Sequence, residues 1–497
     1  MSRQRICLIP LDARPVCYEF PKQLIESAGR EACLPSASIL GQLKQPAQDT
    51  ALQRWIKHHL SEHDPVIVAL DTIAYGGLIP SRVGHEPLSL LEERIDLFFS
   101  RIQAEQCYGY ASILRIPDGL ATDEEPDYWA KYGEKLYRYS IFKHQAKEVP
   151  AGCDTIPADV LQDFLNRRGR NHALNHYLID KLREKQLDYL IFCQDDTGPY
   201  GLNVQEARLL ARKLQKSGLD TVGHVQTGAD EVAHCMVARW LTAQALKKHQ
   251  APVKIWPKYS HPEGDAVVAR FDGISIADIV AQRVQACGAQ LVATPDEADL
   301  WLAVHTPARQ QGDHCSRIEA EVENAQLTTM LDLIARAKEL HKPLAIADVA
   351  YANGSDPKLS VQLINRFEFL GDLYGYAGWN TPGNAIGTAV AMGVTRLLAE
   401  REGTFCPERF QEALMVRFGD DWLYQADIRQ TLRNLGFNGY GLKPGTPKRP
   451  LDEHYLNTLM ADGLSLLRQR FDIAPSDSIV CRFPCNRTFE VELALHA

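Results

Sequence analysis

Residues 188–201 read Asp-Tyr-Leu-Ile-Phe-Cys-Gln-Asp-Asp-Thr-Gly-Pro-Tyr-Gly and hold the clearest strand-and-turn pattern of the chain. The apolar run at 189–193 has the length and composition of a buried parallel strand. It leads into two adjacent acids, Asp195 and Asp196, and then into a Gly/Pro turn before a helical pattern at about 204–213. Acids delivered from a strand into a turn are typical of the functional edge of an α/β enzyme. Asp196 taken alone could equally cap the next helix.

The same pattern recurs along most of the chain. Apolar runs of strand length alternate with helical patterns at 6–10, 66–70, 110–116, 189–193, 221–226, 253–256, 300–304, 344–347 and 373–377. Such alternation predicts an α/β fold with parallel strands. We expect a (β/α)8 TIM-like barrel, because a barrel gathers the polar ends of all its strands at one face. A doubly wound open sheet explains the alternation too, but it concentrates ligands at a switch point.

Two parts of the chain depart from this alternation. Residues 117–160 form an insertion rich in acids and aromatics, which could be a lid or subsite wall, or equally a solvated pair of surface helices. Residues 399–497 hold amphipathic helical patterns and a final β segment at 478–493. We therefore expect a barrel-like catalytic domain over residues 1–398, followed by a smaller C-terminal α+β domain over residues 399–497.

Composition and charge exclude several classes of protein. The 497 residues are 45% hydrophobic and 24% charged, which is ordinary for a globular protein with a large core. A net charge of −9 without a long basic tract argues against nucleic acid and anionic membranes as partners. No apolar run reaches about 18 residues, and we expect no signal peptide or membrane span. The 12 scattered cysteines predict reduced thiols and a cytoplasmic protein, and a homo-oligomer stays open.

Paired acids at the ends of successive strands carry the strongest chemical signal. Asp195 and Asp196 follow one strand, and Asp230 and Glu231 follow the next, so these four are the candidate catalytic residues. Two carboxyl groups in one small cavity push their pKa values apart, which leaves one protonated and the other ionised. Glycosidic cleavage needs such a pair: an acid for the leaving oxygen and an anion for the oxocarbenium-like centre.

Further polar and aromatic residues at the strand ends are candidates for substrate binding. Aromatic rings would offer apolar faces to a sugar, and asparagines would bind its hydroxyl groups. The set comprises Asp12, Arg14, Asp71, Tyr75, Arg82, Arg115, Arg170, Asn171, His172, Asp348, Tyr351, Asn353, Trp379, Asn380 and Asn384. Some of these have ordinary structural readings as well, since Asp12 and Arg14 could form a local ion pair and 170–172 could be helix-surface groups.

Several motifs together carry a family resemblance. They are Leu-Asp-Ala-Arg-Pro at 11–15, Tyr-Gly-Gly-Leu at 75–78 with Ser81-Arg82, Arg-Asn-His at 170–172, Gln-Asp-Asp-Thr at 194–197, Gly-Ala-Asp-Glu at 228–231, Asp-Val-Ala-Tyr-Ala-Asn-Gly at 348–354 and Gly-Trp-Asn-Thr at 378–381. The combination resembles a bacterial family known only as a domain of unknown function, over nearly the whole chain. That resemblance implies no established activity.

A partial resemblance is mechanistic. The Asp-Asp pair after the expected fourth strand is similar to that of barrel glycoside hydrolases assisted by a 2-acetamido group of the substrate. This resemblance implies that Asp195 polarises the acetamido group and that Asp196 is the general acid/base. It also implies that Trp379 and Asn380 hold sugar-floor and hydroxyl-binding positions.

The leading hypothesis is therefore a cofactor-free glycoside hydrolase for a small, 2-acetamido sugar. A second hypothesis is a divalent-metal-dependent lyase, isomerase or phosphoryl-processing enzyme, with oxygen ligands from the acids and nitrogen from histidines. Its candidate ligands are Asp71, Asp195, Asp230, Glu231, Asp348, His172, His261 and His305. A third is a non-catalytic sugar- or nucleotide-binding protein. Serine-nucleophile and Rossmann motifs are absent from the sequence.

Overall fold

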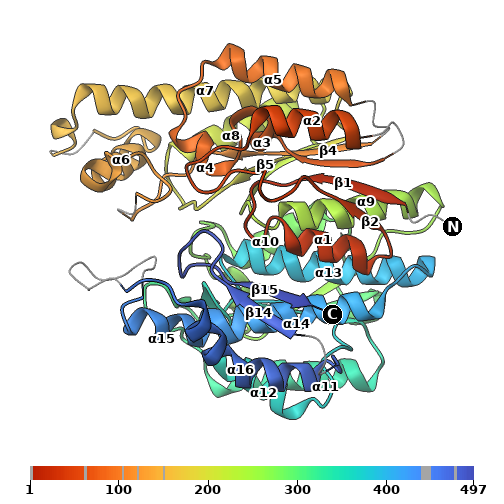
Figure 1. The fold of residues 1–497 in the computed structure, drawn as a ribbon. Coiled ribbons are helices and arrows are strands. Elements are labelled where there is room, and N and C mark those ends of the chain that lie inside the picture. The colour runs from red at the N-terminus through yellow and green to blue at the C-terminus, as the bar shows by residue number, and fades with distance from the viewer. Residues whose placement is uncertain are drawn as a thin grey trace. The chain divides into compact units, whose positions relative to one another are not determined.

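The chain forms two compact units in the computed structural model, which describes residues 4–60, 64–102, 106–119, 122–148, 152–437, 449–474 and 478–496. Contacts assign Met1–Ala13, Glu31–Ala233 and Phe271–Gly273 to the first unit. The second unit comprises Arg14–Arg30, His234–Arg270 and Ile274–Ala497. Each unit is built on its own parallel sheet (Figure 1).

The sheet of the first unit has six parallel strands. Their order across the sheet is β2-β1-β3-β4-β5-β6. The strands are β1 (Arg5–Ile9), β2 (Glu31–Cys33), β3 (Val66–Ala69), β4 (Cys107–Ile113), β5 (Tyr189–Gln194) and β6 (Gly223–Thr227). Because β3, β4 and β5 are neighbours and parallel, their carboxyl ends meet at the same edge.

The core of the first unit follows from the period-2 pattern of its strands. Alternate residues such as Val66 and Val68 on β3, and Leu190 and Phe192 on β5, belong to one buried apolar cluster with the helices. The helices of this unit are α2 (Asp49–His59), α3 (Leu70–Tyr75), α4 (Leu78–Val83), α5 (Leu88–Arg101), α6 (Trp129–His144), α7 (Ala158–Arg183) and α8 (Leu202–Lys216). A short 3-10 turn covers Cys153–Thr155, and α5 contacts α7.

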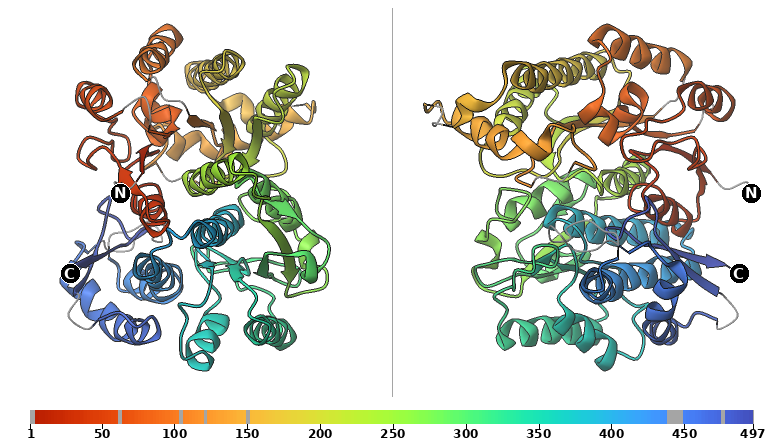
Figure 2. Two further views of the ribbon diagram at one scale, coloured as in Figure 1. Left: turned by 90° about the vertical axis from the view of Figure 1, so that its right-hand side faces the viewer. Right: turned by 60° about the vertical axis from the view of Figure 1, so that its left-hand side comes forward.

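The sheet of the second unit has five parallel strands. Their order is β13-β11-β9-β7-β8. The strands are β7 (Lys254–Tyr259), β8 (Gln290–Leu291), β9 (Leu300–His305), β11 (Leu344–Asp348) and β13 (Gly375–Ala377). Two small pairs accompany this sheet: parallel β10 (Gly312–Asp313) with β12 (Tyr351–Ala352), and antiparallel β14 (Ser478–Arg482) with β15 (Glu492–His496), drawn in blue in Figure 2.

Helices make up most of the rest of the second unit. They are α1 (Glu19–Ser27), α10 (Ile276–Ala286), α11 (Asn324–Glu339), α12 (Pro357–Arg366), α13 (Pro382–Glu402), α14 (Pro407–Arg417), the π-helical segment η4 (Phe418–Ile428), α15 (Arg429–Asn434) and α16 (Glu453–Arg470). Helix α9 (Val232–Lys247) begins where the main segment of the first unit ends, and 3-10 turns cover Gly264–Ala266 and Pro295–Glu297. Small residues let α13 pack closely on β11 and β13.

The structure confirms an α/β fold with parallel sheets and places a strand at each apolar run of the sequence. In each sheet the second strand lies outside the first and the third lies on the other side of the first, which is the order of doubly wound folds. These pairings do not show the (β/α)8 barrel, which stays a prediction. The reason is that both architectures share the same alternation of strand and helix, and only the choice of strand partners separates them.

The predicted domain boundary at residue 398 also stays a prediction. Residues 399–497 lie in the second unit as helices followed by the antiparallel β14–β15 pair, which is consistent with an α+β appendage. The insertion at 117–160 contains α6 and the beginning of α7. Within the part of the chain that the structure describes, no helix is both long and apolar enough to cross a membrane.

Candidate functional site

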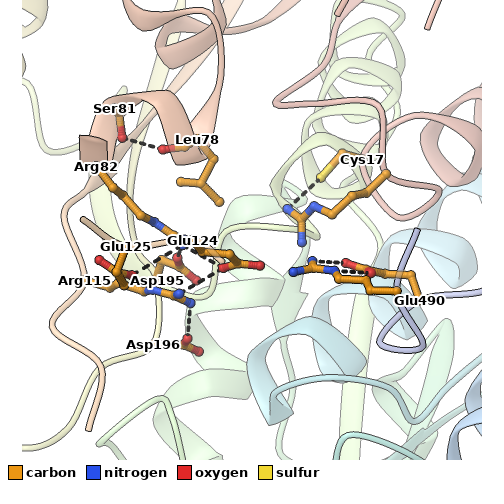
Figure 3. A network of polar contacts seen from close by, with 12 residues as sticks. Cys17, Leu78, Ser81, Arg82, Arg115, Glu124, Glu125, Asp195, Asp196 and Glu490 are labelled. Atoms are coloured by element: carbon orange, nitrogen blue, oxygen red, sulfur yellow. Dashed lines mark hydrogen bonds and ion pairs between the residues drawn. The ribbon is translucent and has the colours of Figure 1, made fainter. Parts of the chain in front are cut away.

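Two arginines and four carboxylates gather at the carboxyl edge of the first sheet. Arg82 is in the last turn of α4, and Arg115 lies two residues beyond β4. Asp195 and Asp196 directly follow β5. Glu124 and Glu125 come from the insertion and complete the group, which we call the strand-end cluster (Figure 3).

Local sequence positions Arg82 at this edge. Helix α3 ends at Gly76, whose φ of 85° is in the left-handed region that favours glycine. A Cβ atom at Gly76 would lie 2.8 Å from the backbone nitrogen of Ala47, so a larger residue would also clash there. Gly77, with φ of 138°, then redirects the chain into α4. The turn therefore explains the two adjacent glycines of the Tyr-Gly-Gly-Leu motif.

Each arginine of the strand-end cluster contacts both glutamates and one aspartate. The Nη1 atom of Arg82 donates to Oε2 of Glu124 over 2.8 Å and lies 3.7 Å from Oε1 of Glu125, and its Nη2 atom donates to Oδ2 of Asp195. Arg115 donates from Nη2 to Oε2 of Glu124 over 2.9 Å, and from Nε to Oε1 of Glu125 over 2.7 Å. Its Nη1 atom donates to Oδ2 of Asp196 over 2.6 Å.

The charges of the strand-end cluster do not balance when every group is ionised. Two guanidinium groups face four carboxylates, so the ionised cluster carries two negative charges in excess. The arginine side chains are only 4% and 10% exposed, which keeps water from screening these charges. Although burial lowers the pKa of Arg115, the neighbouring carboxylates raise it well above its ordinary value. Arg115 thus stays charged.

Asp196 is the carboxyl group whose pKa is raised in this negatively charged cluster. Burial, and then the negative charge of Asp195, raise the pKa of Asp196 to about 7, against the opposing effect of Arg115. Its side chain is 28% exposed, the most of the four carboxylates, and Asp195 follows at 17%. At neutral pH the cluster therefore holds one carboxyl group that exchanges a proton and is reached by solvent.

The turn after β5 fixes the direction of these two carboxyl groups. Asp196 has a φ of 36°, a left-handed conformation that asparagine and aspartate tolerate better than other side chains. The backbone N–H of Thr197 donates to the carbonyl oxygen of Phe271 over 2.7 Å, and Asn203 donates to the Thr197 hydroxyl over 3.0 Å. These bonds hold the strained residue in place, and the N-cap position of α8 is Gly201 rather than Asp196.

Helix α7 supports the strand-end cluster through buried arginines. Arg168 forms two hydrogen bonds to Glu206, of 2.9 and 2.6 Å, and donates to the carbonyl oxygens of Leu114 and Arg115 over 3.0 and 3.3 Å. Arg167 donates to the carbonyl oxygen of Arg82 over 3.0 Å. Both arginines of the cluster are therefore held through their own backbone by this helix.

Three predicted substrate-binding residues take structural positions beside α4. Arg170 donates to the carbonyl oxygen of Ser81 over 3.1 Å and covers the ring of Tyr75 at 5.2 Å. Asn171 donates to the same Ser81 oxygen over 3.1 Å. Burial raises the pKa of the Tyr75 hydroxyl well above its ordinary value. These contacts anchor α4; binding of substrate by these residues stays a prediction.

Asp71 lies deeper at the same edge. Its Oδ2 atom accepts hydrogen bonds from the backbone N–H and the hydroxyl of Ser112, over 2.7 and 2.8 Å. Burial raises the pKa of Asp71 to about 6, while the two Ser112 bonds oppose that rise. The carboxyl therefore ties the start of α3 to the end of β4. Asp12, after β1, is half-buried in the same unit.

The second predicted acid pair is more deeply buried than the first. Asp230 is 7% exposed and Glu231 is 0% exposed, at the start of α9. The amide of Gln226 lies 3.5 Å from Oε1 of Glu231. Burial, followed by the charges of Asp71, Glu231 and Asp195, raises the pKa of the Cys193 thiol well above its ordinary value, so that thiol stays protonated.

The other predicted substrate-binding residues belong to the second unit, and their meeting with the strand-end cluster stays a prediction. They are Arg14, Asp348, Tyr351, Asn353, Trp379, Asn380 and Asn384. Arg14 donates to Sγ of Cys17 over 3.6 Å. The Trp379 ring is 4% exposed, and the Asn384 backbone N–H completes the Thr381 cap of α13.

Asp348, Tyr351 and Asn353 all sit close to the end of β11. Asp348 accepts the backbone N–H of Asp356 over 2.7 Å, and burial raises its pKa to about 7. Asn353 donates to Asp313 over 2.9 Å and its backbone N–H donates to the carbonyl oxygen of Asn380 over 2.8 Å. Tyr351 donates to Glu319 over 3.0 Å.

The histidines of the metal hypothesis are dispersed over both units. His172 contacts His176 one helical turn later, over 3.0 Å, and burial lowers its pKa to about 4. In the second unit, His305 bonds to Asp356 over 3.0 Å, and His261 accepts the backbone N–H of Glu263 over 3.2 Å. Among the residues that the structure describes, no group of three or more His, Cys, Asp or Glu side chains is arranged to hold a metal ion.

Glu124 and Glu125 are the functional candidates that the sequence reasoning missed. They belong to the acid-rich part of the insertion. The sequence feature that could have identified them is their position nine and ten residues after Arg115, with which both form ion pairs. A hollow of about 420 Å³ lies next to them in sequence: Val83 and Pro126, which directly follow Arg82 and Glu125, line it together with Tyr128, whereas the cluster residues themselves do not. The first unit therefore combines a strand-end cluster with a neighbouring hollow large enough for a sugar ring.

The fold and site define an α/β protein with parallel sheets and a carboxylate–arginine cluster at the strand ends. The chain belongs to the family described as "Protein of unknown function (DUF4127)", whose model matches residues 6–494. That match confirms the resemblance to a domain of unknown function. No curated protein and no solved structure matches the chain.

Proposed function

We propose that the protein is a glycoside hydrolase that acts on a small 2-acetamido sugar, with Asp196 as the general acid/base and Asp195 as the stabilising anion. One observation carries the proposal: two adjacent carboxyl groups, each paired with a buried arginine, lie in one cluster, and the negative charge of the first acts on the second. Burial and the charge of Asp195 raise the pKa of Asp196 to about 7, although Arg115 opposes that rise. That division of labour is what cleavage of a glycosidic bond requires.

The mechanism begins with proton transfer from Asp196 to the leaving glycosidic oxygen. The carbonyl oxygen of the 2-acetamido group attacks the anomeric carbon as the bond to the leaving oxygen breaks. Asp195 accepts the acetamido N–H and stabilises the positive charge that develops on the ring and the acetamido group. Water then attacks the anomeric carbon, Asp196 takes its proton, and the acetamido group is restored. The 2.6 Å hydrogen bond from Arg115 holds the Asp196 carboxyl group in one orientation during these steps.

The hollow beside the cluster supports this reading. Tyr128 lines it, and the Tyr128 hydroxyl donates to Asp163 over 2.8 Å, which fixes the ring. An aromatic face held in this way suits the C–H surface of a sugar. We place the part of the substrate that does not react in this hollow. Asp230 and Glu231, which belong to the same unit, stay secondary members of the proposed site.

The proposal does not depend on a closed barrel. In a (β/α)8 barrel and in a doubly wound sheet alike, ligands bind at the carboxyl ends of parallel strands, where the strand-end cluster lies. The barrel over residues 1–398 stays part of the proposal as an expectation. A cytoplasmic location, expected from the sequence, would suit a small imported saccharide rather than a polymer.

The test is hydrolysis of aryl 2-acetamido-2-deoxyglycosides by single amide variants. We expect Asp196→Asn and Asp195→Asn each to lose about 100-fold or more in kcat/KM. Asp123→Asn is the matched control, because this exposed carboxylate lies in the same insertion beside Glu124. Full activity in both variants of the 195–196 pair would remove the proposal. Activity that disappears on chelation and returns with a stoichiometric divalent ion would favour the metal-dependent alternative.

A further inference from the structure

A second hollow, of about 390 Å³, lies in the second unit at the N-terminal ends of its strands. Leu344, the first residue of β11, and Tyr374, directly before β13, form part of its wall. The end of α11 and the end of α12 supply the other sides. These are the opposite ends of the strands from those where α/β proteins place their catalytic groups, so the hollow is separate from any site at the carboxyl edge of this sheet.

The wall of this hollow is mainly apolar. Leu344, Leu363 and Leu373 are buried at its base, and the rings of Phe367 and Phe369 are half-exposed beside them. Ten of its fifteen lining residues are Ala, Ile, Leu, Pro, Phe or Tyr. The volume falls in the range of small-molecule sites, about 300–1,000 Å³. A ligand that covers the apolar wall gains about 25 cal/mol for each Å² of apolar surface that it removes from water.

The polar groups around the hollow are mainly basic. Lys338, His341, Lys342 and Arg396 line it, against a single acid, Asp372. Arg396 is already engaged by Glu400 and by the carbonyl oxygens of Gly371 and Leu373. Lys338 is exposed and Lys342 is half-buried, and neither forms an ion pair with another described residue. The hollow therefore offers an apolar wall with two available positive charges on one side.

We propose that this hollow binds a small amphipathic anion, such as a medium-chain carboxylate. The apolar wall takes the hydrocarbon part, and Lys338 and Lys342 pair with the carboxylate. A cationic amphiphile would meet the same wall but repel these lysines, and a neutral one would leave them without a partner. The hollow belongs to a different unit from the strand-end cluster, so binding of this anion does not require the glycosidase activity.

The test is calorimetric titration of the full chain with octanoate, octyltrimethylammonium and 1-octanol at pH 7.5. We expect saturable 1:1 binding of octanoate and a Kd at least tenfold weaker for the other two. The double variant Lys338→Gln/Lys342→Gln should raise the octanoate Kd about five- to tenfold, because each exposed ion pair contributes modestly. Phe369→Ala should weaken the binding of all three ligands, because it removes an aromatic ring of the apolar wall that their hydrocarbon chains would contact.

The matched control is Lys216→Gln/Lys247→Gln, which removes two exposed lysines from the ends of α8 and α9. This control should bind octanoate like the native chain. Equal affinity for octanoate and octyltrimethylammonium would overturn the proposal, as would an unchanged Kd in the lysine variant. No saturable binding of octanoate, together with a dimer in sedimentation that Phe369→Ala abolishes, would assign the hollow to a second copy of this chain instead.

Discussion

The Nη1 atom of Arg115 donates a 2.6 Å hydrogen bond to Oδ2 of Asp196, whose pKa burial and the charge of Asp195 raise to about 7. Arg115 opposes that rise, since a positive charge favours the ionised carboxyl. We predict that Arg115→Met raises the pKa of Asp196 further, by roughly one to three pH units. Carbon-13 NMR titration of the aspartate carboxyls measures this directly. Arg115→Lys, which keeps the charge, should move the pKa less.

In the proposed mechanism Asp196 must be protonated to act, so activity falls as the pH rises through its pKa. Arg115→Met should therefore move the basic limb of the kcat/KM profile to higher pH. A profile that keeps its native limb while the NMR titration shifts would mean that another group is the acid. An unshifted NMR titration would mean that Arg115 does not control Asp196.

Asp195 acts on Asp196 in the opposite sense, because its negative charge raises the pKa of its neighbour. We predict that Asp195→Asn lowers the pKa of Asp196 and moves the basic limb of the residual activity to lower pH. The variant should also lose about 100- to 1,000-fold in kcat, as expected when a group that stabilises charge in the transition state is removed. A kcat within threefold of the native value would contradict the role given to Asp195.

The sequence predicts the positions of most strands well, although the run at 110–116 becomes β4 at Cys107–Ile113, and it does not determine which strands pair. The apolar run at 189–193 becomes β5 (Tyr189–Gln194), and the run at 344–347 becomes β11 (Leu344–Asp348), because a buried parallel strand must be apolar on both faces. The pairing of β1 with both β2 and β3 depends on contacts between segments far apart in sequence. Spacing alone does not determine which strands pair, which is why the pattern led us to expect a barrel although it also fits a doubly wound order.

The strand-end cluster could be predicted in part for the same reason. Arg115 and Asp195 follow neighbouring strands, and parallel strands bring such residues to one edge. The place of Glu124 in the cluster was not predicted, because this residue belongs to an insertion without a periodic pattern. Its hydrogen bonds to Arg82 and Arg115 hold it at the edge of the sheet. The contact by which Arg170 anchors α4 could not be predicted, because every residue has a backbone carbonyl oxygen and the sequence does not show which one an arginine binds.

The Tyr128 ring is expected to bind the non-reacting part of the substrate. Tyr128→Ala should raise KM for an oligosaccharide substrate about tenfold with little change in kcat, because uniform binding is lost while the reacting groups stay in place. For an aryl monosaccharide, which does not fill the hollow, the change in KM should be small. Tyr128→Phe, which keeps the ring, is the control. Equal losses on both substrates would indicate a structural role for Tyr128 instead.

Arg168 and Glu206 form a buried ion pair whose disruption should be costly. We predict that Arg168→Met lowers the free energy of unfolding by about 3–5 kcal/mol, because it leaves Glu206 buried without its partner. Burial already raises the pKa of Glu206, so the loss should be smaller at low pH, where that carboxyl is neutral. The double variant Arg168→Met/Glu206→Met should recover much of the loss. Thermal denaturation at pH 5 and pH 8 provides the measurement.

A second ion pair on the same helix gives the control for this prediction. Arg183 pairs with Asp180 over 2.9 Å, and the arginine side chain is 61% exposed. Arg183→Met should change the free energy of unfolding by less than about 1 kcal/mol, as for other exposed pairs. Equal effects of Arg168→Met and Arg183→Met would show that burial does not set the value of these pairs.

Asp420 makes the stability of the second unit depend on pH. Burial, and then the charge of Asp421, raise its pKa to about 7, above the value of about 3.9 in an unfolded chain. The folded state therefore holds a proton that the unfolded state releases, and the stability that this proton provides is lost as the pH rises from about 4 to about 7.

Asp420→Asn removes the titration, while its side-chain oxygen can still accept the 2.8 Å bond from Gln425. We predict that the Tm of Asp420→Asn relative to the native chain increases between pH 5 and pH 8, by roughly 2–4 °C for each 1 kcal/mol. Asp462→Asn, which replaces an exposed aspartate on α16, should show no such trend. A constant difference in Tm between Asp420→Asn and the native chain across this range would place the pKa of Asp420 outside it.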